Sequence, residues 1–148
     1  MTQPAKPTRP PPPTLDQFPH RTWDKIRYRD TDRQGHVNNA VFMTLLDTGR
    51  TELFYDPDHP LADPGCTFVT ARLSMDLLAE INWPGRVDVG TRVAAIGRSS
   101  TTVEQALFQS GRCAATATVV VVHVDASGRG QPLSEGALDI LRACGPAG

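Results

Sequence analysis

The sequence has few cysteines, no marked charge excess and no long hydrophobic run, and each of these absences excludes a class of protein. Its 148 residues include only three cysteines, Cys66, Cys113 and Cys144, and no C-x-x-C pair. We therefore expect neither a disulfide framework nor a zinc knuckle. A reducing compartment, the cytoplasm, fits this cysteine usage best.

Positive charge does not dominate, because 15 Lys and Arg residues face 16 Asp and Glu residues. Nucleic acids and anionic membranes attract clustered positive charge, so neither is an expected partner. The apolar run at residues 119–122 has only four valines, whereas a membrane-spanning helix needs about 20 apolar residues. The N-terminus also lacks the charged and apolar regions of a secretory signal, so we expect no such signal.

Proline is concentrated at the N-terminus, where residues 1–20 hold seven of the thirteen prolines. Four of them are consecutive, at residues 10–13. Proline cannot donate a backbone hydrogen bond to a helix or a sheet. We therefore predict a disordered Pro-rich tail over residues 1–20 and a single folded domain over residues 21–145, a length that suits one hydrophobic core.

One long helix is predicted by apolar residues that recur at spacings of three and four. Asn38 is its expected N-cap, and Pro57 prevents its continuation. The apolar stripe comprises Val41, Phe42, Leu45, Leu46, Gly49, Leu53 and Phe54.

The rest of the folded part reads as strands and a short final helix. A strand is predicted over residues 23–28, before the long helix. Beyond Gly65 the apolar period changes to two, and the strands and helix expected there are 69–77, 87–95, 102–108, 113–124 and, for the helix, 134–141. One helix packed on consecutive antiparallel strands is an α+β arrangement. Because one helix covers one sheet face, the second face or an edge is expected to need another subunit.

The densest group of polar residues, 30–39, lies in the loop before the long helix. A helix N-terminus presents unpaired N–H groups and a positive dipole end, which stabilise developing negative charge. A carboxylate in this loop could act as a general base or a nucleophile. Asp32, Asn38 and Asn39 could instead only cap the helix, and the pattern alone leaves both interpretations open.

Three other interpretations of this loop fit less well. An EF-hand loop would need a glutamate where Val41 stands, so calcium is not expected. His36 has no second His or Cys at ligand spacing, so no metal site is expected. A serine nucleophile would need a G-x-S-x-G turn, which the chain lacks, and Cys66 has a poor context for a nucleophile.

Residues 30–40, D-T-D-R-Q-G-H-V-N-N-A, resemble the signature loop of the 4-hydroxybenzoyl-CoA thioesterase family. The bacterial acyl-CoA thioesterases of that family have the loop D-x-D-x-x-G-H-V-N-N. The likeness covers residues 22–142, since 69–77 resembles the family's second strand and 96–100 its turn between central strands.

This resemblance implies a hotdog fold, in which a five-stranded antiparallel β-sheet wraps around one long α-helix; here a short C-terminal helix is appended. It implies an acyl-CoA thioesterase that hydrolyses its substrate without a cofactor or a metal. It also implies a homodimer or homotetramer with the substrate across the subunit interface. The sequence departs from the family in its Pro-rich tail and in Gly49, where relatives more often have alanine.

The resemblance also assigns roles within the loop. Asp32 matches the catalytic carboxylate, and the backbone N–H of Asn39 matches the oxyanion donor. Gly35 is expected to keep the loop tight, and His36 and Asn38 to orient the loop and the acyl group.

Arg98, Ser99 and Ser100 are expected to contact the CoA part of the substrate, unless they are only an exposed hairpin turn. Two rival functions remain at this point. One is a hotdog hydratase or dehydratase, although residues 36–39 do not match the catalytic histidine pattern of those enzymes. The other is a non-catalytic acyl-CoA-binding protein, although residues 1–20 cannot supply a regulatory domain.

Overall fold

The predicted apolar stripe forms helix α1, Asn39–Phe54, in the computed structural model, which describes residues 2–5 and 9–145. The side chain of Asn38 accepts the N–H of Ala40 at 2.9 Å, so the predicted N-cap is confirmed. The stripe faces the sheet, and its buried members are Phe42, Leu45, Leu46, Gly49, Leu53 and Phe54.

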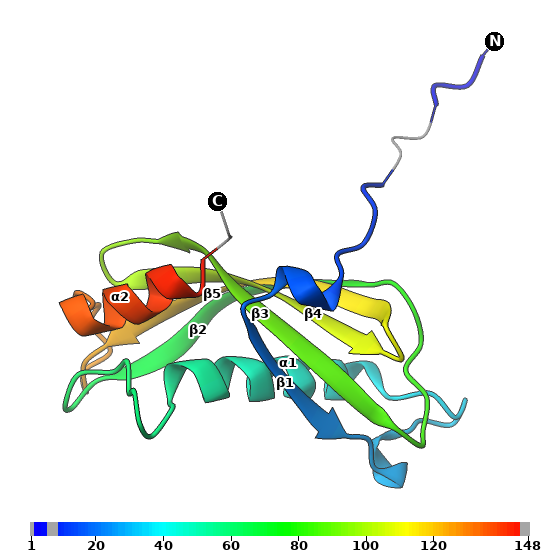
Figure 1. Ribbon diagram of the computed structural model, residues 1–148, viewed down its shortest axis with the longest axis horizontal. Coiled ribbons are helices and arrows are strands. Elements are labelled where there is room, and N and C mark those ends of the chain that lie inside the picture. Colours follow the sequence, from blue (N-terminus) through cyan, green and yellow to red (C-terminus); the bar gives the residue numbers. More distant parts are fainter. Residues whose placement is uncertain (1, 6–8, 146–148) are drawn as a thin grey trace.

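Five antiparallel strands form one sheet in the order β1-β3-β4-β5-β2. They are β1 (His20–Lys25), β2 (Thr67–Leu77), β3 (Arg86–Ile96), β4 (Ser100–Gln109) and β5 (Arg112–Val124). The sheet curves around α1, which lies along one face (Figure 1). This is the hotdog arrangement that the sequence predicts.

A short C-terminal helix, α2 (Glu135–Ala143), covers an edge that would otherwise be open. Strand β1 pairs with β3 only as far as Thr91, and beyond it Val93 donates its N–H to the carbonyl of Cys144 at 2.8 Å. The predicted helix over residues 134–141 is confirmed, with Ser134 as its N-cap. No helix in the described part of the chain is long and apolar enough to cross a membrane.

Gly49 allows α1 to approach the sheet closely. A Cβ atom at this position would lie 2.6 Å from the Val89 side chain, a separation that Cβ atoms in proteins essentially never show. The approach brings the buried Arg50 side chain to Gln105, whose amide oxygen accepts from Nη1 at 2.8 Å. Gln105 in turn donates to the carbonyl of Leu46 at 3.0 Å. The helix-propensity cost of glycine, about 1 kcal/mol, is therefore offset by packing.

The opposite face of the sheet carries a second, smaller apolar cluster. A 3-10 turn, η1 (Leu15–Gln17), places Phe18 on this face, where the residue is only 1% exposed. Phe18 packs edge-on against Phe108, with ring centroids 6.0 Å apart, and fills the space above Gly90.

The predicted disordered tail is therefore too long at its C-terminal end. Residues 14–20 have a defined structure, which comprises η1 with Thr14 as its N-cap, the buried Phe18 and the start of β1 at His20. Residues 2–5 and 9–13 have neither helix nor strand, and residues 1 and 6–8 of the predicted tail lie outside the described residues.

Two strands differ from their predicted limits or faces. The first strand is at His20–Lys25 rather than 23–28, and Tyr28 begins a 3-10 turn, η2 (Tyr28–Asp30). In β2 the predicted alternation places Val69 and Leu77 on the buried face, yet they are 43% and 46% exposed. The reason is that β2 is an edge strand with a register shift after Thr70.

Candidate active site

The polar loop before α1 closes on itself and so fixes the position of Asp32. The backbone N–H of Asp32 donates to the carbonyl of His36 at 2.8 Å, and a bridge joins Thr31 to Val37. Gly35 donates its N–H back to the carbonyl of Asp32 at 3.0 Å and has φ of 82°. Few residues other than glycine adopt this left-handed conformation, which accounts for Gly35 in the loop.

Asp32 has an exposed carboxylate on the wall of a cavity of about 360 Å³. Its Oδ1 accepts the N–H of Gln34 at 2.8 Å, within the same loop. None of the hydrogen bonds in the described part of the chain joins Asp32 to an N–H of α1, so Asp32 does not cap the helix. The cavity is also lined by Gln34, His36, Val37, Asn39, Phe42, Leu77, Leu78, Ala79 and Glu80.

Asn39, the first residue of α1, lines the same cavity. Asn38 satisfies two of the first amides: its side chain accepts from Ala40, and its carbonyl accepts from Val41 at 2.9 Å. Among the described residues, nothing accepts the N–H of Asn39, and Asn39 lines the cavity with Asp32. A donor at the positive end of a helix dipole suits an oxygen that gains negative charge.

His36 joins the loop to the segment that follows β2. Its Nε2 lies 2.7 Å from the Oε2 of Glu80, and both side chains are partly exposed. The backbone of His36 also forms a bridge with Asn82. Sequence reasoning missed Glu80, because it lies far from the loop along the chain and no spacing pattern links the two.

Asp30 differs sharply from Asp32, although only Thr31 separates them. Its buried carboxylate accepts the backbone N–H of Arg27 at 2.8 Å and the guanidinium Nη2 of Arg27 at 3.0 Å. Burial acts to raise the pKa of Asp30, but the hydrogen bonds and charge of Arg27 outweigh it and hold the pKa below its ordinary value. Asp30 does not line the cavity and supports the loop instead.

Arg98, Ser99 and Ser100 lie at the other end of the sheet. The carbonyl of Ser99 accepts the N–H of His123 at 2.7 Å, and Ser100 pairs with Val122. The turn between β3 and β4 and the start of α1 are at opposite ends of the molecule (Figure 1). One copy of the chain thus brings together Asp32, Gly35, His36, Asn38 and Asn39 but not the three turn residues.

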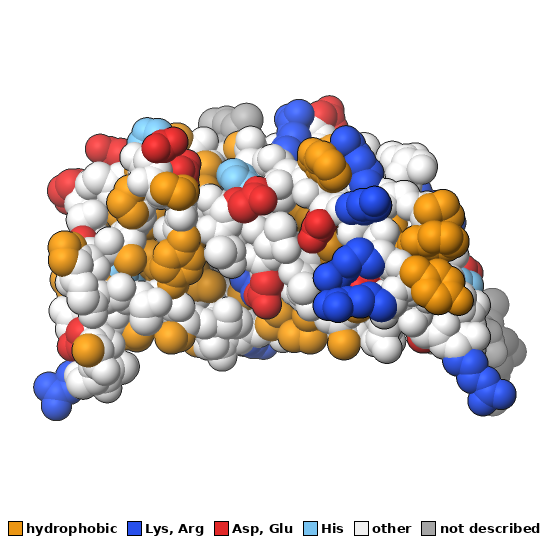
Figure 2. All heavy atoms as spheres, turned by 90° about the horizontal axis from the view of Figure 1, so that it is seen from below, with side chains coloured by type: hydrophobic (Ala, Val, Ile, Leu, Met, Phe, Trp, Pro, Cys, Tyr) orange, Lys and Arg blue, Asp and Glu red, His pale blue; other side chains and the backbone are white. Residues whose placement is uncertain are grey.

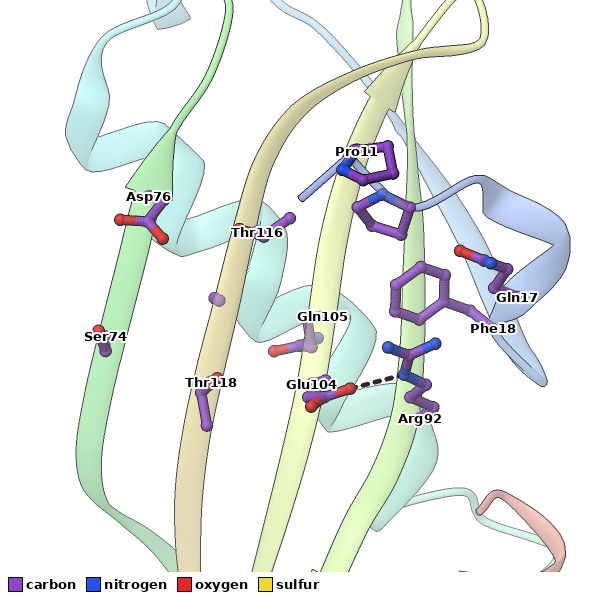
Figure 3. Close-up of a pocket in the computed structure, with 12 residues that line it drawn as sticks. Pro11, Gln17, Phe18, Ser74, Asp76, Arg92, Glu104, Gln105, Thr116 and Thr118 are labelled. Carbon is purple, nitrogen blue, oxygen red and sulfur yellow. Dashed lines mark hydrogen bonds and ion pairs between the residues drawn. The ribbon is translucent and has the colours of Figure 1, made fainter. Parts of the chain in front are cut away.

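A second cavity, of about 380 Å³, lies on the sheet face opposite α1 (Figure 3). Pro11 and Phe18 form one side, and the ion pair between Arg92 and Glu104, at 2.6 Å, forms part of the floor. No sequence pattern indicated this cavity, except a phenylalanine inside a proline-rich segment.

Across the described residues, no group of three or more His, Cys, Asp or Glu side chains is placed to hold a metal ion.

Comparison with known proteins supports one family. The sequence model of the thioesterase-like superfamily matches residues 26–141. No curated protein matches the chain significantly in sequence. The chain is similar to the PA5185 protein of Pseudomonas aeruginosa PAO1, with 28% identity and a TM-score of 0.83 over 93% of this chain and 99% of that one.

Two further solved structures are thioesterases by description. One is a thioesterase from Thermus thermophilus complexed with coenzyme A and Zn, with 34% identity and a TM-score of 0.75 over 88% of this chain and 96% of that one. The other is the DHNA-CoA thioesterase of Staphylococcus aureus, with 21% identity and a TM-score of 0.66 over 76% of this chain and 77% of that one. The second likeness concerns the fold alone.

Proposed function

The chain belongs to the thioesterase-like superfamily, and on this premise we propose that it hydrolyses acyl-CoA thioesters to a free acid and CoA. The observation that carries the proposal is the placement of the Asp32 carboxylate and the unpaired Asn39 N–H on the wall of one cavity. The coenzyme A bound to the Thermus thermophilus thioesterase supports a CoA thioester as the substrate.

The chemistry follows from these two groups. The thioester carbonyl oxygen accepts the N–H of Asn39, which stabilises the negative charge that develops during attack. Asp32 either removes a proton from a water that attacks the carbonyl carbon, or attacks this carbon itself to form a mixed anhydride that water then hydrolyses. Both routes expel the CoA thiolate, which takes up a proton.

His36, Gly35 and Asn38 act as positioning residues in this proposal. The contact between His36 and Glu80 holds one wall of the cavity, and Gly35 lets the loop close behind Asp32. Asn38 satisfies the N–H of Ala40 and so leaves Asn39 as the donor that faces the substrate.

The proposal includes a dimer that completes the site. Strand β2 pairs only with β5, so its other edge is free within the described chain, and exposed Val69 and Leu77 lie on this strand. A free, partly apolar edge suits antiparallel pairing with β2 of a second copy. The start of β2 lies near the turn that carries Arg98, because Phe68 pairs with His123 and His123 donates its N–H to the carbonyl of Ser99. The end of β2 lies at the other end of the sheet, where Leu77 lines the Asp32 cavity. Antiparallel pairing would therefore bring Arg98 of the partner subunit toward Asp32.

We propose the reducing cytoplasm as the compartment, because the chain has three cysteines and no C-x-x-C pair. The associated proposals, a CoA substrate and no cofactor, need no redox chemistry.

A panel of acyl-CoA substrates with medium, long and aromatic acyl groups, assayed by the release of free thiol, tests the function. We expect hydrolysis of at least one member and its loss in Asp32→Asn. Binding of acyl-CoA without thiol release would instead indicate a sensor. Loss of enoyl-thioester absorbance without thiol release would indicate a hydratase.

A further inference from the structure

Three large aromatic side chains are exposed beside the Asp32 loop. The exposed fractions are 56% for Trp23, 73% for Tyr28 and 46% for Trp83. Their segments are joined by hydrogen bonds, since β1 pairs with β3 and the N–H of Ile26 donates to the carbonyl of Gly85 at 2.9 Å. Exposed aromatic residues gathered in this way mark interaction surfaces more often than chance.

The aromatic rings support one another but leave their outer surfaces open. Tyr28 and Trp83 meet edge to face, with centroids 5.3 Å apart and ring planes at 83°. The guanidinium of Arg86 lies 5.1 Å from the centroid of the Trp23 ring. Two rings nearly at right angles do not form a parallel slot for a nucleotide base.

Several basic residues lie in the same segments as these rings. Arg27 and Arg86 are paired with Asp30 and Asp88. Three more basic residues of this segment take part in none of the ion pairs of the described chain, namely Lys25, Arg29 and Arg33. On the face shown in Figure 2, Lys and Arg side chains gather at one end beside hydrophobic ones. The net charge of the chain is −1, so this positive charge is local.

This surface, which we call the aromatic–basic surface (Trp23, Lys25, Tyr28, Arg29, Arg33 and Trp83), borders the Asp32 cavity. Arg33 directly follows Asp32, and Trp83 directly follows Asn82, which forms a backbone bridge with His36. Asp32 and His36 both line the cavity. A molecule bound to the aromatic–basic surface would therefore lie next to the Asp32 cavity.

We propose that the aromatic–basic surface docks an acidic protein that carries the thioester to be hydrolysed. Trp, Tyr and Arg are the residues that most often dominate the binding energy of protein interfaces. Unpaired basic groups around them add charge complementarity, which speeds association with an acidic partner. The docking itself rests only on this surface, and the delivery of a thioester rests on the proposed function.

Binding can be measured with the full chain and purified acyl carrier protein, an acidic protein that bears a phosphopantetheine arm, without any acyl group. The chain has two tryptophans, and both belong to the aromatic–basic surface, so their fluorescence reports on it directly. We expect a saturable change that weakens as salt is added. Tyr28→Ala and Arg29→Glu should each raise Kd at least about tenfold, the cost of one strong interface contact.

Arg142→Glu is the matched control, since Arg142 is an exposed arginine of α2, on a different part of the molecule, and its Kd should change less than about twofold. The absence of saturable binding by the wild type overturns the proposal, as does an equal effect of the control. An altered monomer–dimer balance in Tyr28→Ala would assign the surface to a second copy, which also overturns it.

A second measurement compares the same acyl group on the carrier protein and on CoA. We expect Tyr28→Ala and Arg29→Glu to raise KM for the carrier-bound thioester at least about tenfold and to leave acyl-CoA within about twofold. Equal losses on both would assign the surface to the CoA phosphates and overturn the docking proposal. If carrier binding persists but no thioester is hydrolysed, the proposed function fails and the docking surface stands.

Discussion

The two ends of the sheet differ in how completely their polar groups are satisfied. At the Arg98 end, the carbonyls of Arg98 and Ser99 accept the N–H groups of Leu133 and His123. The Asp125 loop there is also closed by hydrogen bonds, and that of the Ser127 hydroxyl does most to hold the pKa of Asp125 below its ordinary value.

At the Asp32 end, Asp32 and Asn39 line one cavity, and no acceptor among the described residues pairs with the Asn39 N–H. At the Arg98 end, the exposed charge of the Arg98 side chain is the group available to a ligand. At the Asp32 end, a substrate oxygen can accept the Asn39 N–H, which has no acceptor among the described residues. This difference separates groups that hold the fold from groups that are available for chemistry.

The largest expected effect is that of Asp32→Asn at the unsatisfied end. The amide has the same size and can still accept from Gln34, so the fold should survive, but it cannot take a proton or attack a carbonyl carbon. We expect kcat/KM to fall about 100- to 10,000-fold, the range of a lost general base, with an unchanged melting temperature. A variant that keeps more than about a tenth of the wild-type value lies outside this range and contradicts the assignment.

Mixed dimers test whether the two ends meet across an interface. Asp32→Asn and Arg98→Glu are each expected to impair their homodimers. A mixed dimer contains one Asp32→Asn chain and one Arg98→Glu chain. If each active site takes Asp32 from one chain and Arg98 from the other, one site of the mixed dimer has both substitutions and the other site has neither. Co-expressed and separately tagged mixed dimers should then recover roughly half of the wild-type activity. No recovery would place both residues of a site in the same chain.

Asp30 tests whether the Asp32 end also contains a group that only holds the fold. Asp30→Asn removes the charge that the Arg27 hydrogen bonds stabilise, at a cost of about 1 to 3 kcal/mol in the free energy of unfolding. Activity per folded molecule should fall far less than in Asp32→Asn. Urea unfolding and kcat/KM measured on the same sample check both expectations.

The pH dependence of this stability has a definite sign. Because the folded-state pKa of Asp30 lies below its ordinary value, the unfolded state binds more protons in the window between the two. The contribution is complete above the ordinary aspartate pKa of about 4 and is lost as pH falls through the lowered folded-state value. The difference in unfolding free energy between wild type and Asp30→Asn should therefore shrink with acidification, and a constant difference would contradict this origin.

The parts of the fold that the sequence predicted are those with local, periodic signals. Helix α1 and its Asn38 cap follow from a stripe and a capping residue that do not depend on distant partners. The order of strands β2 to β5 follows from alternation and turn residues. The alternation correctly predicts that Leu73 and Met75 pack against the core, but it could not predict the exposure of Val69, which precedes the register shift in this edge strand.

Long-range packing accounts for the other differences. The burial of Phe18 depends on the space above Gly90 and beside Phe108, which no local pattern in a proline-rich segment reveals. Gly49 reads locally as a weak helix residue, and only the position of Val89 shows why it is there. At the candidate site, the loop positions of Asp32 and Gly35 were predictable, whereas the contact of His36 with Glu80 was not.

The smallest expected effect belongs to Arg98→Ala at the satisfied end. The turn should persist, because the Arg98 backbone carbonyl, not its side chain, accepts from Leu133. The exposed guanidinium of Arg98 is proposed to bind a phosphate of a CoA substrate that is held by a partner chain. Its loss would then weaken the binding of the substrate and of the transition state equally. KM for acyl-CoA should then rise about tenfold with little change in kcat.

A comparison of substrates separates this role from a general charge effect. An acyl-pantetheine lacks the nucleotide phosphates, so Arg98→Ala should leave its KM unchanged. Arg129→Ala removes another exposed charge at the same end, from a loop whose backbone is held by Asp125, and should alter neither substrate by more than about twofold. Equal KM increases for acyl-CoA and acyl-pantetheine would remove Arg98 from the site. The Arg98 end would then have no part in substrate binding, and Arg98 would be only an exposed residue of the turn between β3 and β4.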